Sequence, residues 1–217
     1  MPAFQRTRLG VFFYAQVYVS DPADQRRCAL AARRRLTPAV RRRFSHRACT
    51  RLSRLAVFRR ARRIGLYWPL SSEIDPRPLL AACRAEQRVY LPRVQAHHLR
   101  FVAITGPDFP SRNSSLGVRE PRGGRSVAVH TLDLLIMPLA AFDARAHRIG
   151  LGGGFYDRTL SGYRQRPYAC PQLVGLAYDV QRVDAIRPKP WDVSLDMVVS
   201  ERAVYPGYRR VDGPGLY

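Results

Sequence analysis

Residues 132–157, LDLLIMPLAAFDARAHRIGLGGGFYD, decide the fold class of this 217-residue chain. The first six residues form an almost continuous apolar run that stops at Pro138, a pattern typical of a strand buried on both faces. A glycine-rich segment, 150–154, lies further along, and we predict that a helix begins near Phe155. A buried strand, a glycine-rich turn and a helix in this order are typical of α/β proteins.

The flanking sequence repeats this alternation of apolar runs and helical patterns. Thr37-Pro38 is a cap sequence followed by apolar residues at helical spacing, and Asp75-Pro76 is a second candidate cap. Residues 105–124 are rich in Gly, Pro, Ser and Asn, which predicts a long loop. The predicted helices cover 23–35, 38–62 and 79–82. The other predicted strands cover 64–68, 88–91, 99–104, 173–178 and 197–200.

Strands that alternate with helices predict one mainly parallel sheet with helices on both faces, a three-layer α/β fold of Rossmann-like type. Sugar-phosphate isomerases and CoA transferases have related architectures. In such sheets, ligands bind beyond the carboxyl ends of the strands. We expect a single domain over 25–205, an N-terminal extension over 1–24 and a C-terminal tail over 206–217.

The chain is strongly basic, because 37 Lys and Arg against 16 Asp and Glu give a net charge of +21. Lys189 is the only lysine, so 36 of the 37 cations are arginines, which suggests a coding bias rather than selection for phosphate contacts. Between Arg26 and Arg63 there are 15 arginines and no acidic residue. A basic nucleic-acid-binding protein that uses these helices is the alternative function. A solvated helix face is expected instead, because only Phe44 and Phe58 interleave as aromatics for base stacking.

Several function classes are excluded by missing patterns. The four cysteines have no C-x-x-C spacing, so we expect free thiols in a reducing compartment, the cytoplasm, rather than zinc ligands or disulfides. No apolar run reaches the roughly 20 residues of a membrane helix. The chain has no Walker loop, no G-x-G-x-x-G fingerprint and no G-x-S-x-G elbow. All five histidines are predicted to be surface residues: His46, His97, His98, His130 and His147.

The segment RIGLGGGFYD, residues 148–157, is the first candidate for chemistry. Glycines ahead of a helix allow backbone N–H groups to approach phosphate oxygens, and Arg148 adds a positive charge. Asp157, one turn into the predicted helix, is a candidate magnesium ligand. A flexible turn that precedes a helix is the alternative interpretation of the same glycines.

Two further segments carry candidate site residues. In YWPLSSEIDP, residues 67–76, the ring of Trp68 and the carboxylate of Glu73 suit a flat heterocycle that donates hydrogen bonds. The alternative is a core tryptophan and a solvated glutamate. In WDVSLD, residues 191–196, Asp192 is a weak metal signal unless it meets Asp157 in space.

Taken together, the chain resembles the 5-formyltetrahydrofolate cyclo-ligase family, also called methenyltetrahydrofolate synthetase. Six segments match the family in its order: YWPLSSEID (67–75), VYLPRV (89–94), LDLLIMPLAAFD (132–143), RIGLGGGFYDRTL (148–160), VGLAYD (174–179) and WDVSLDMVVSE (191–201). The most specific part is AFD followed by R-x-G-x-G-G-G-F-Y-D.

The resemblance implies an ATP-dependent ring closure that requires magnesium. 5-Formyltetrahydrofolate and ATP would give 5,10-methenyltetrahydrofolate, ADP and phosphate. The formyl oxygen attacks the γ-phosphate to form an imidate phosphate, and N10 of the folate then attacks the activated carbon. The implied partners are these two small molecules, with no membrane and no nucleic acid, and the protein is expected to be a monomer.

The resemblance also assigns roles to residues by position. The nucleotide would contact Arg26, Arg148, Ile149, Gly150, Leu151, Gly152, Gly153, Gly154, Phe155 and Tyr156. The folate would contact Trp68, Glu73, Leu151, Gly152, Gly153, Gly154 and Phe155. The residues implied in catalysis are Arg148, Phe155 and Tyr156. Asp157 and Asp192 would hold Mg²⁺, and Arg33 would lie near Arg26.

Two departures from the family pattern affect the phosphate contacts. The family has a lysine about four residues before Arg26, where this chain has Pro22, and Arg27 is a candidate to supply that charge. Some members also have basic residues inside the glycine segment, where this chain has Leu151 and Gly153. Another chemistry on the same fold, such as that of sugar-phosphate isomerases or acyl-CoA transferases, remains the second alternative.

Overall fold

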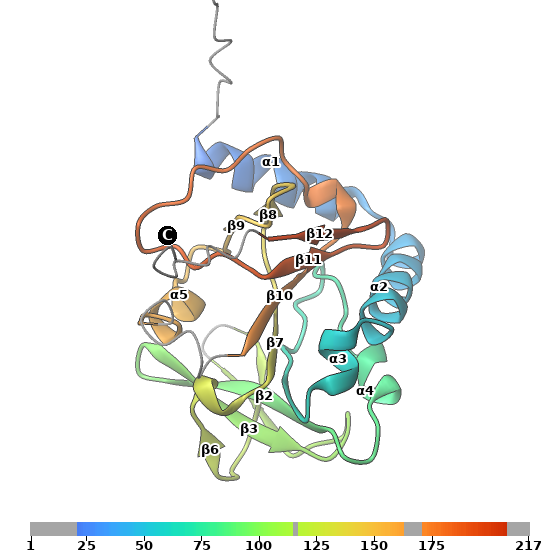
Figure 1. The fold of residues 1–217 in the computed structure, drawn as a ribbon, viewed down its shortest axis with the longest axis vertical. Coiled ribbons are helices and arrows are strands. Elements are labelled where there is room, and N and C mark those ends of the chain that lie inside the picture. The colour runs from blue at the N-terminus through green and yellow to red at the C-terminus, as the bar shows by residue number, and fades with distance from the viewer. Residues whose placement is uncertain (1–20, 115–116, 163–170, 208–217) are drawn as a thin grey trace, which may run out of the picture.

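The computed structural model describes residues 21–114, 117–162 and 171–207. Eight strands form one sheet, in the order β12-β11-β10-β7-β1-β2-β3-β6 (Figure 1). The strands are β1 (Arg63–Gly65), β2 (Arg88–Gln95), β3 (His98–Ile104), β6 (Ser126–Val127), β7 (Leu134–Met137), β10 (Gln172–Leu176), β11 (Met197–Val199) and β12 (Val204–Pro206).

The five central strands, β11, β10, β7, β1 and β2, are all parallel. Ile64 of β1 pairs with Leu134 on one side and Val89 on the other, which sets the register at the centre of the sheet. The edge strands β12, β3 and β6 are antiparallel to their neighbours. The predicted mainly parallel α/β sheet is therefore confirmed.

Both faces of β7 are buried, as its continuous apolar sequence predicts. Leu134 and Ile136 face a core that α2 (Pro38–Ser53), α3 (Ala56–Arg60) and α4 (Pro78–Ala82) complete. Leu135 and Met137 face the opposite core, beside α5 (Phe155–Thr159) and several irregular segments. Helices lie on both faces (Figure 1), and among the described residues α5 is the α-helix of the second layer.

Helix α1 (Pro22–Arg35) lies across one end of the sheet rather than on a face (Figure 1). It packs on the two-stranded sheet of β8 (Ala141–Phe142) and β9 (Arg148–Ile149) and on the 3₁₀ helix η3 (Asp179–Gln181). Because β8 follows β7 and η3 follows β10, α1 covers the carboxyl end of the parallel strands. Its residues can therefore reach the place where a ligand is expected.

The predicted second helix, 38–62, is wrong in its length. Thr37 caps α2 as expected, accepting a hydrogen bond from the N–H of Val40, but the helix ends at Ser53. Leu55 is extended, and α3 then begins at Ala56. The break redirects the chain so that Phe58, 1% exposed, enters the core.

The predicted Asp75 cap is also wrong. Helix α4 begins at Pro78 and makes no side-chain cap hydrogen bond. The Asp75 carboxylate instead binds the N–H and the guanidinium of Arg77, its neighbour two residues along.

The predicted loop 105–124 contains ordered strands. Short strands β4 (Ser111–Asn113) and β5 (Arg119–Pro121) pair antiparallel with each other as a separate hairpin. Their three-residue length leaves too little periodicity for a strand signal to stand out among the turn residues. One further 3₁₀ helix, η1 (Val129–Thr131), precedes β7.

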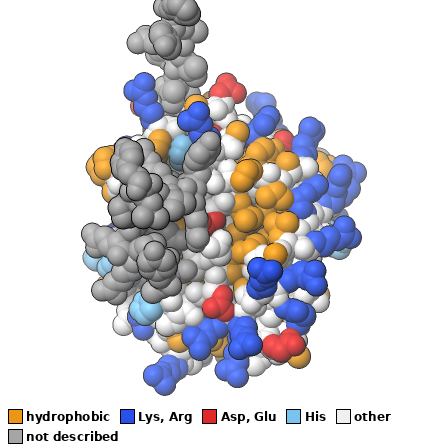
Figure 2. Space-filling model, viewed as in Figure 1, with side chains coloured by type: hydrophobic (Ala, Val, Ile, Leu, Met, Phe, Trp, Pro, Cys, Tyr) orange, Lys and Arg blue, Asp and Glu red, His pale blue; other side chains and the backbone are white. Residues whose placement is uncertain are grey.

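Figure 2 shows Lys and Arg side chains over α2 and along the lower edge of the visible face, beside a band of hydrophobic side chains. No helix within the described ranges has the length and apolar character to cross a membrane. The domain boundaries at 24 and 205 stay predictions, although α1 already begins at Pro22 and β12 extends to Pro206.

Four histidines are exposed, as predicted: His46, His97, His98 and His130. His147 is only half-buried at the surface, and this part of the prediction is wrong. Its Nδ1 pairs with the buried carboxylate of Asp143 at 2.9 Å, which also accepts hydrogen bonds from the N–H groups of Arg145 and Ile186. Cys28, Cys49 and Cys83 are free thiols, and Cys170 lies outside the described residues.

Candidate active site

A cavity of about 310 Å³ lies at the carboxyl end of the parallel strands, between three segments that are far apart in the sequence. One wall is the loop after β1, another is the β4–β5 hairpin with the end of β2, and the third is the glycine segment with α5. The lining residues are Tyr67, Trp68, Leu70, Glu73, Pro92, Val94, Leu99, Ser114, Val118, Glu120, Pro138, Arg148, Gly150, Leu151, Gly153, Gly154, Phe155, Tyr156 and Asp157. The volume is at the lower end of the range for small-molecule sites.

Glu73 presents an unsatisfied hydrogen-bond acceptor at this cavity. The residue is 6% exposed, so the interpretation of a solvated glutamate is wrong. Its Oε2 accepts from the N–H of Leu70 at 2.9 Å, whereas Oε1 is buried with no hydrogen-bond partner in the described part of the chain. A buried oxygen without a partner costs about 1–3 kcal/mol, so this atom favours a ligand that donates a hydrogen bond.

The charge of Glu73 is set by opposing effects. Burial raises the pKa of this carboxyl above its ordinary value, while the N–H of Leu70 and the positive charge of Arg33 act to lower it. Arg33, on α1, is 5% exposed and donates to Ser72 Oγ at 3.1 Å, next to Glu73 in the chain. A buried cation thus lies behind the loop that carries the buried carboxylate.

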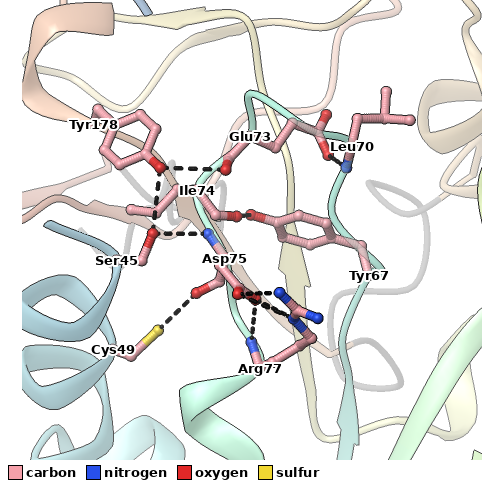
Figure 3. A network of polar contacts seen from close by, with 9 residues as sticks. All are labelled: Ser45, Cys49, Tyr67, Leu70, Glu73, Ile74, Asp75, Arg77 and Tyr178. Carbon is pink, nitrogen blue, oxygen red and sulfur yellow. Dashed lines mark hydrogen bonds and ion pairs between the residues drawn. The ribbon is translucent and has the colours of Figure 1, made fainter. Parts of the chain in front are cut away.

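A network of neutral polar groups fixes the backbone of this loop (Figure 3). Tyr178, which follows β10, donates from its hydroxyl to the carbonyl of Glu73 at 3.2 Å. The hydroxyl of Ser45, on α2, lies 3.2 Å from that of Tyr178 and accepts from the N–H of Asp75 at 3.0 Å. The thiol of Cys49 donates to the Asp75 carbonyl at 3.3 Å, and burial raises the pKa of this thiol to about 12.

The aromatic residues of the loop divide between core and cavity. Tyr67 is buried and donates from its hydroxyl to the carbonyl of Ile74 at 2.7 Å, closing the loop on itself (Figure 3). Trp68 is half-buried: it packs against the core, with its ring edge to face 5.2 Å from Phe109, and it also lines the cavity. Trp68 therefore belongs to the core and also lines the cavity, and its contact with a heterocycle stays a prediction.

Arginines hold the glycine segment through its carbonyl oxygens. Arg26 Nε, from α1, donates to the carbonyl of Gly150 at 2.9 Å. Arg158 Nη2, from α5, donates to the carbonyl of Gly153 at 2.8 Å. Gly154 has a φ of +64°, where a Cβ is strained. Two carbonyl oxygens of the segment are thus already bonded to arginines.

Arg148 and Asp157 form an ion pair at the base of this segment. The Arg148 side chain is almost fully buried, and its Nε has no hydrogen-bond partner among the described residues. The neighbouring Tyr156 lines the same cavity, and burial, reinforced by the charge of Glu73, raises its pKa. The carboxylate of Asp157, the phenol of Tyr156 and the guanidinium of Arg148 therefore lie together on the wall that this segment forms.

Comparison with known proteins now decides the family. Residues 20–201 match the model of the 5-formyltetrahydrofolate cyclo-ligase family. The chain belongs to the 5-formyltetrahydrofolate cyclo-ligase family. The protein of that name from Escherichia coli K12 is 35% identical over 179 residues, which are 80% of this chain and 96% of the relative. The relative from Haemophilus influenzae is 36% identical over 143 residues, 63% of this chain and 74% of its own length.

Solved structures agree with the family and the fold. The NMR structure of the 5,10-methenyltetrahydrofolate synthetase of Aquifex aeolicus superposes with a TM-score of 0.74, at 28% identity, covering 90% of this chain and 96% of that one. The synthetase of Mycoplasma pneumoniae has a TM-score of 0.64 at 22% identity, covering 84% and 99%, and supports the fold alone. The resemblance found in the sequence is thus confirmed.

Within this cyclo-ligase fold, most of the predicted folate and nucleotide residues meet at one cavity. Trp68, Glu73 and most of the segment 148–157 line it together, and Arg26 reaches Gly150 from α1. Arg27, the candidate replacement for the missing family lysine, is instead exposed and pairs with Asp24 at 2.8 Å.

The two predicted magnesium ligands are placed differently. Asp157 lines the cavity, whereas Asp192 is not among its lining residues and accepts from the N–H of Lys189 at 2.8 Å in a turn. No group of three metal-binding side chains occurs in the part of the chain that the structure describes. Because Mg²⁺ commonly takes one or two carboxylates and completes its shell with substrate phosphates and water, the exposed part of Asp157 still fits one ligand position.

Sequence reasoning missed the wall that the β4–β5 hairpin contributes. Val118 and Glu120 line the cavity, and Glu120 is 3% exposed. The only signal was the length of the loop 105–124, since loops of that length inside a domain are commonly functional.

Proposed function

We propose that this protein catalyses the ATP- and Mg²⁺-dependent cyclisation of 5-formyltetrahydrofolate to 5,10-methenyltetrahydrofolate, releasing ADP and phosphate. The observation that carries the proposal is the buried, unpartnered Oε1 of Glu73 in a cavity whose opposite wall is the arginine-held glycine segment. One wall is built for a ring that donates hydrogen bonds, and the other for an anion. The names of the family and the relatives point to the folate, and ATP is the co-substrate that the family resemblance implies.

The folate wall combines one acceptor with flat apolar surfaces. Glu73 would accept hydrogen bonds from N–H groups of the pterin, which satisfies the oxygen that folding leaves unpaired. The rings of Trp68 and Phe155 line the same cavity and would pack on the heterocycle. Bound in this way, the folate would have to place its N5-formyl group toward the glycine segment, where the phosphate is expected.

The phosphate wall would stabilise charge during transfer. The formyl oxygen would attack the γ-phosphorus as ADP leaves. N10 would then form its bond to the activated carbon and release its proton, and the carbon–oxygen bond would break to release phosphate. Backbone N–H groups of 150–154 and the guanidinium of Arg148 face this chemistry, which is mostly positioning and charge stabilisation. An incoming phosphate would share Arg148 with Asp157, which holds the guanidinium in place.

Mg²⁺ would be held by the phosphates and by Asp157, and when bound it supplies positive charge to the transferring phosphoryl group. Asp192 does not line the described cavity, so it would bind the ion only if its turn moved the carboxylate toward Asp157. This chain would thus supply one carboxylate ligand to Mg²⁺, and phosphate oxygens would take other positions around the ion.

The test is turnover followed by the absorbance of 5,10-methenyltetrahydrofolate. Purified protein with 5-formyltetrahydrofolate, ATP and Mg²⁺ is expected to form product, and omission of ATP is expected to stop it. The matched control is Glu73→Gln, which preserves shape and removes the charge. No product at generous enzyme concentration, or product formed equally without ATP, would reject the proposal.

We further infer that the protein acts as a cytoplasmic monomer on small molecules. The free thiols of Cys28, Cys49 and Cys83 support a reducing compartment. Light scattering of the eluted protein tests the monomer, and a mass of twice 24.7 kDa would contradict it.

A further inference from the structure

The β4–β5 hairpin stands against the end of β2 as one wall of the cavity. Val118, which precedes β5, and Glu120, within β5, line the cavity together with Trp68 and Glu73. The hairpin itself is only two three-residue strands, which are marginal in isolation. Its position must therefore come from side chains that fasten it to the rest of the fold.

Glu120 fastens one side of the hairpin to β2. Its buried Oε1 accepts from the N–H of Val94 at 3.1 Å. Val94 lies beyond the residues of β2 that pair with β1, so on that side its N–H has no neighbouring strand to bond. The carboxylate takes the place of that strand, while Arg112 Nη2 approaches the other oxygen at 3.5 Å.

Arg119 fastens the other side of the hairpin to the aromatic pair. Its Nε donates to Ser111 Oγ at 2.7 Å, and Nη1 and Nη2 donate to the carbonyls of Pro107 and Phe109 at 3.3 and 3.2 Å. Its Cζ lies 4.8 Å from the ring centroid of Trp68 and 4.5 Å from that of Phe109. One guanidinium thus joins both strands of the hairpin, the segment before it and two rings that pack edge to face.

We propose that Arg119 is a positioning residue that holds Trp68 and the β4–β5 hairpin in place as a preformed wall for the flat ring of the substrate. The planar guanidinium is required because it stacks on aromatic faces while its N–H groups donate in fixed directions. A lysine would keep the charge but lose the stacking and most of these hydrogen bonds. The identity of the ring rests on the proposed function; the preformed wall does not.

The experiment uses Trp68 as its own reporter. The chain has two tryptophans, and Trp191 is 67% exposed and absent from the cavity, so Trp191→Phe leaves Trp68 as the single tryptophan. In this background, Arg119→Met and Arg119→Lys are compared with the parent. The matched control is Arg77→Met, which removes the other guanidinium on the Trp68 ring, at 5.3 Å, without touching the hairpin.

The first measurement needs no ligand. Acrylamide quenching of Trp68 is expected to rise about twofold in Arg119→Met, and by a smaller factor in Arg119→Lys, because the face that Arg119 covers opens to solvent. Arg77→Met is expected to stay near the parent. Equal quenching in the parent and both Arg119 variants would overturn the proposal. If Arg119→Met does not unfold cooperatively, the comparison rests on Arg119→Lys alone. Quenching equal to that of the parent would then overturn the proposal.

The second measurement separates this proposal from the proposed function. Quenching of Trp68 by 5-formyltetrahydrofolate without ATP reports binding, and its Kd is expected to rise about tenfold in Arg119→Met, as for loss of one stacked contact. In steady state, KM for the folate rises while kcat and KM for ATP stay within about twofold. If the parent does not bind 5-formyltetrahydrofolate, the folate is not the ligand and the proposed function fails. The acrylamide result would still decide whether Arg119 holds the wall in place. Equal rises in both KM values, or rises matched by Arg77→Met, would overturn the role of Arg119.

Discussion

Two of the loops that line the cavity are held by different means. The loop 67–75 is held mainly by neutral groups, the hydroxyl of Ser45 on α2 and that of Tyr178 after β10, with the buried Arg33 bonded to Ser72. Its key residue Glu73 is 6% exposed. The glycine segment 150–154 is held by guanidinium groups of α1 and α5, and Leu151 in it is 41% exposed.

This difference matches what each wall must bind. Buried neutral hydrogen bonds fix a backbone firmly, so the first loop can leave one carboxylate oxygen unpaired for a specific donor. The exposed Arg158 and the half-buried Arg26 hold a backbone less firmly, because solvent screens their charges, and cations also attract anions. The glycine segment would therefore be able to adjust around the phosphate that is proposed to bind there.

The largest expected effect comes from Glu73→Gln, which breaks the first wall at its functional atom. Loss of a charge-assisted hydrogen bond costs about 1.5–3 kcal/mol, so KM for 5-formyltetrahydrofolate is expected to rise roughly 10- to 100-fold. KM for ATP is expected to stay within about twofold. Steady-state kinetics with each substrate varied in turn measure both. Parallel losses for the two substrates would show that the walls do not act separately.

The next largest effect is expected from Gly154→Ala in the second wall. Its φ of +64° makes a Cβ cost about 1–2 kcal/mol. The added Cβ would also lie 2.6 Å from Arg158 Nη1 and displace that arginine from the segment. We expect KM for ATP to rise about fivefold or more, with KM for the folate changed less. The control is Gly106→Ala, where a Cβ meets nothing within 4 Å; an equal effect there would contradict the explanation.

The sequence predicted the second wall better than the first. The segment 148–157 concentrates glycines, Arg148 and Asp157 in ten residues, so local spacing already marks it as a candidate site, with a flexible turn as the alternative. The central strands were equally visible, because burial on both faces leaves continuous apolar runs such as 134–137.

The support of the first wall could not be predicted in the same way. Ser45 and Tyr178 are 133 residues apart, and a serine on a helix or a tyrosine after a strand has no local pattern that names its partner. Glu120 and Arg119 lie in three-residue strands within a polar loop, so neither period nor composition marks them. Convergence of Asp157 and Asp192 stays a prediction, since only Asp157 lines the described cavity.

A smaller effect is expected from Tyr178→Phe, which loosens the first wall without touching its carboxylate. The variant removes the donor to the Glu73 carbonyl and the partner of Ser45, so the free energy of unfolding should fall by about 1–3 kcal/mol. KM for the folate should rise a few-fold, because Glu73 is positioned less well. Tyr205→Phe is the control: its hydroxyl binds Asp179 away from this loop, so it should lose stability without the KM effect. Identical kinetics for the two variants would show that the network is structural only.

The smallest expected effect is a pH dependence of stability that belongs to the first wall alone. Burial raises the pKa of Glu73 in the folded protein, so the folded state holds this proton at pH values where the unfolded chain has released it. Between the ordinary and the raised pKa, the contribution of Glu73 to the free energy of unfolding therefore falls as pH rises. Glu73→Gln cannot titrate, so the variant should gain stability relative to the parent as pH rises through this window. Urea unfolding of both proteins at several pH values measures the difference, in which the raised pKa of Glu201 cancels because both proteins contain it. A difference independent of pH would mean that Arg33 and Leu70 fully offset the burial of the carboxylate.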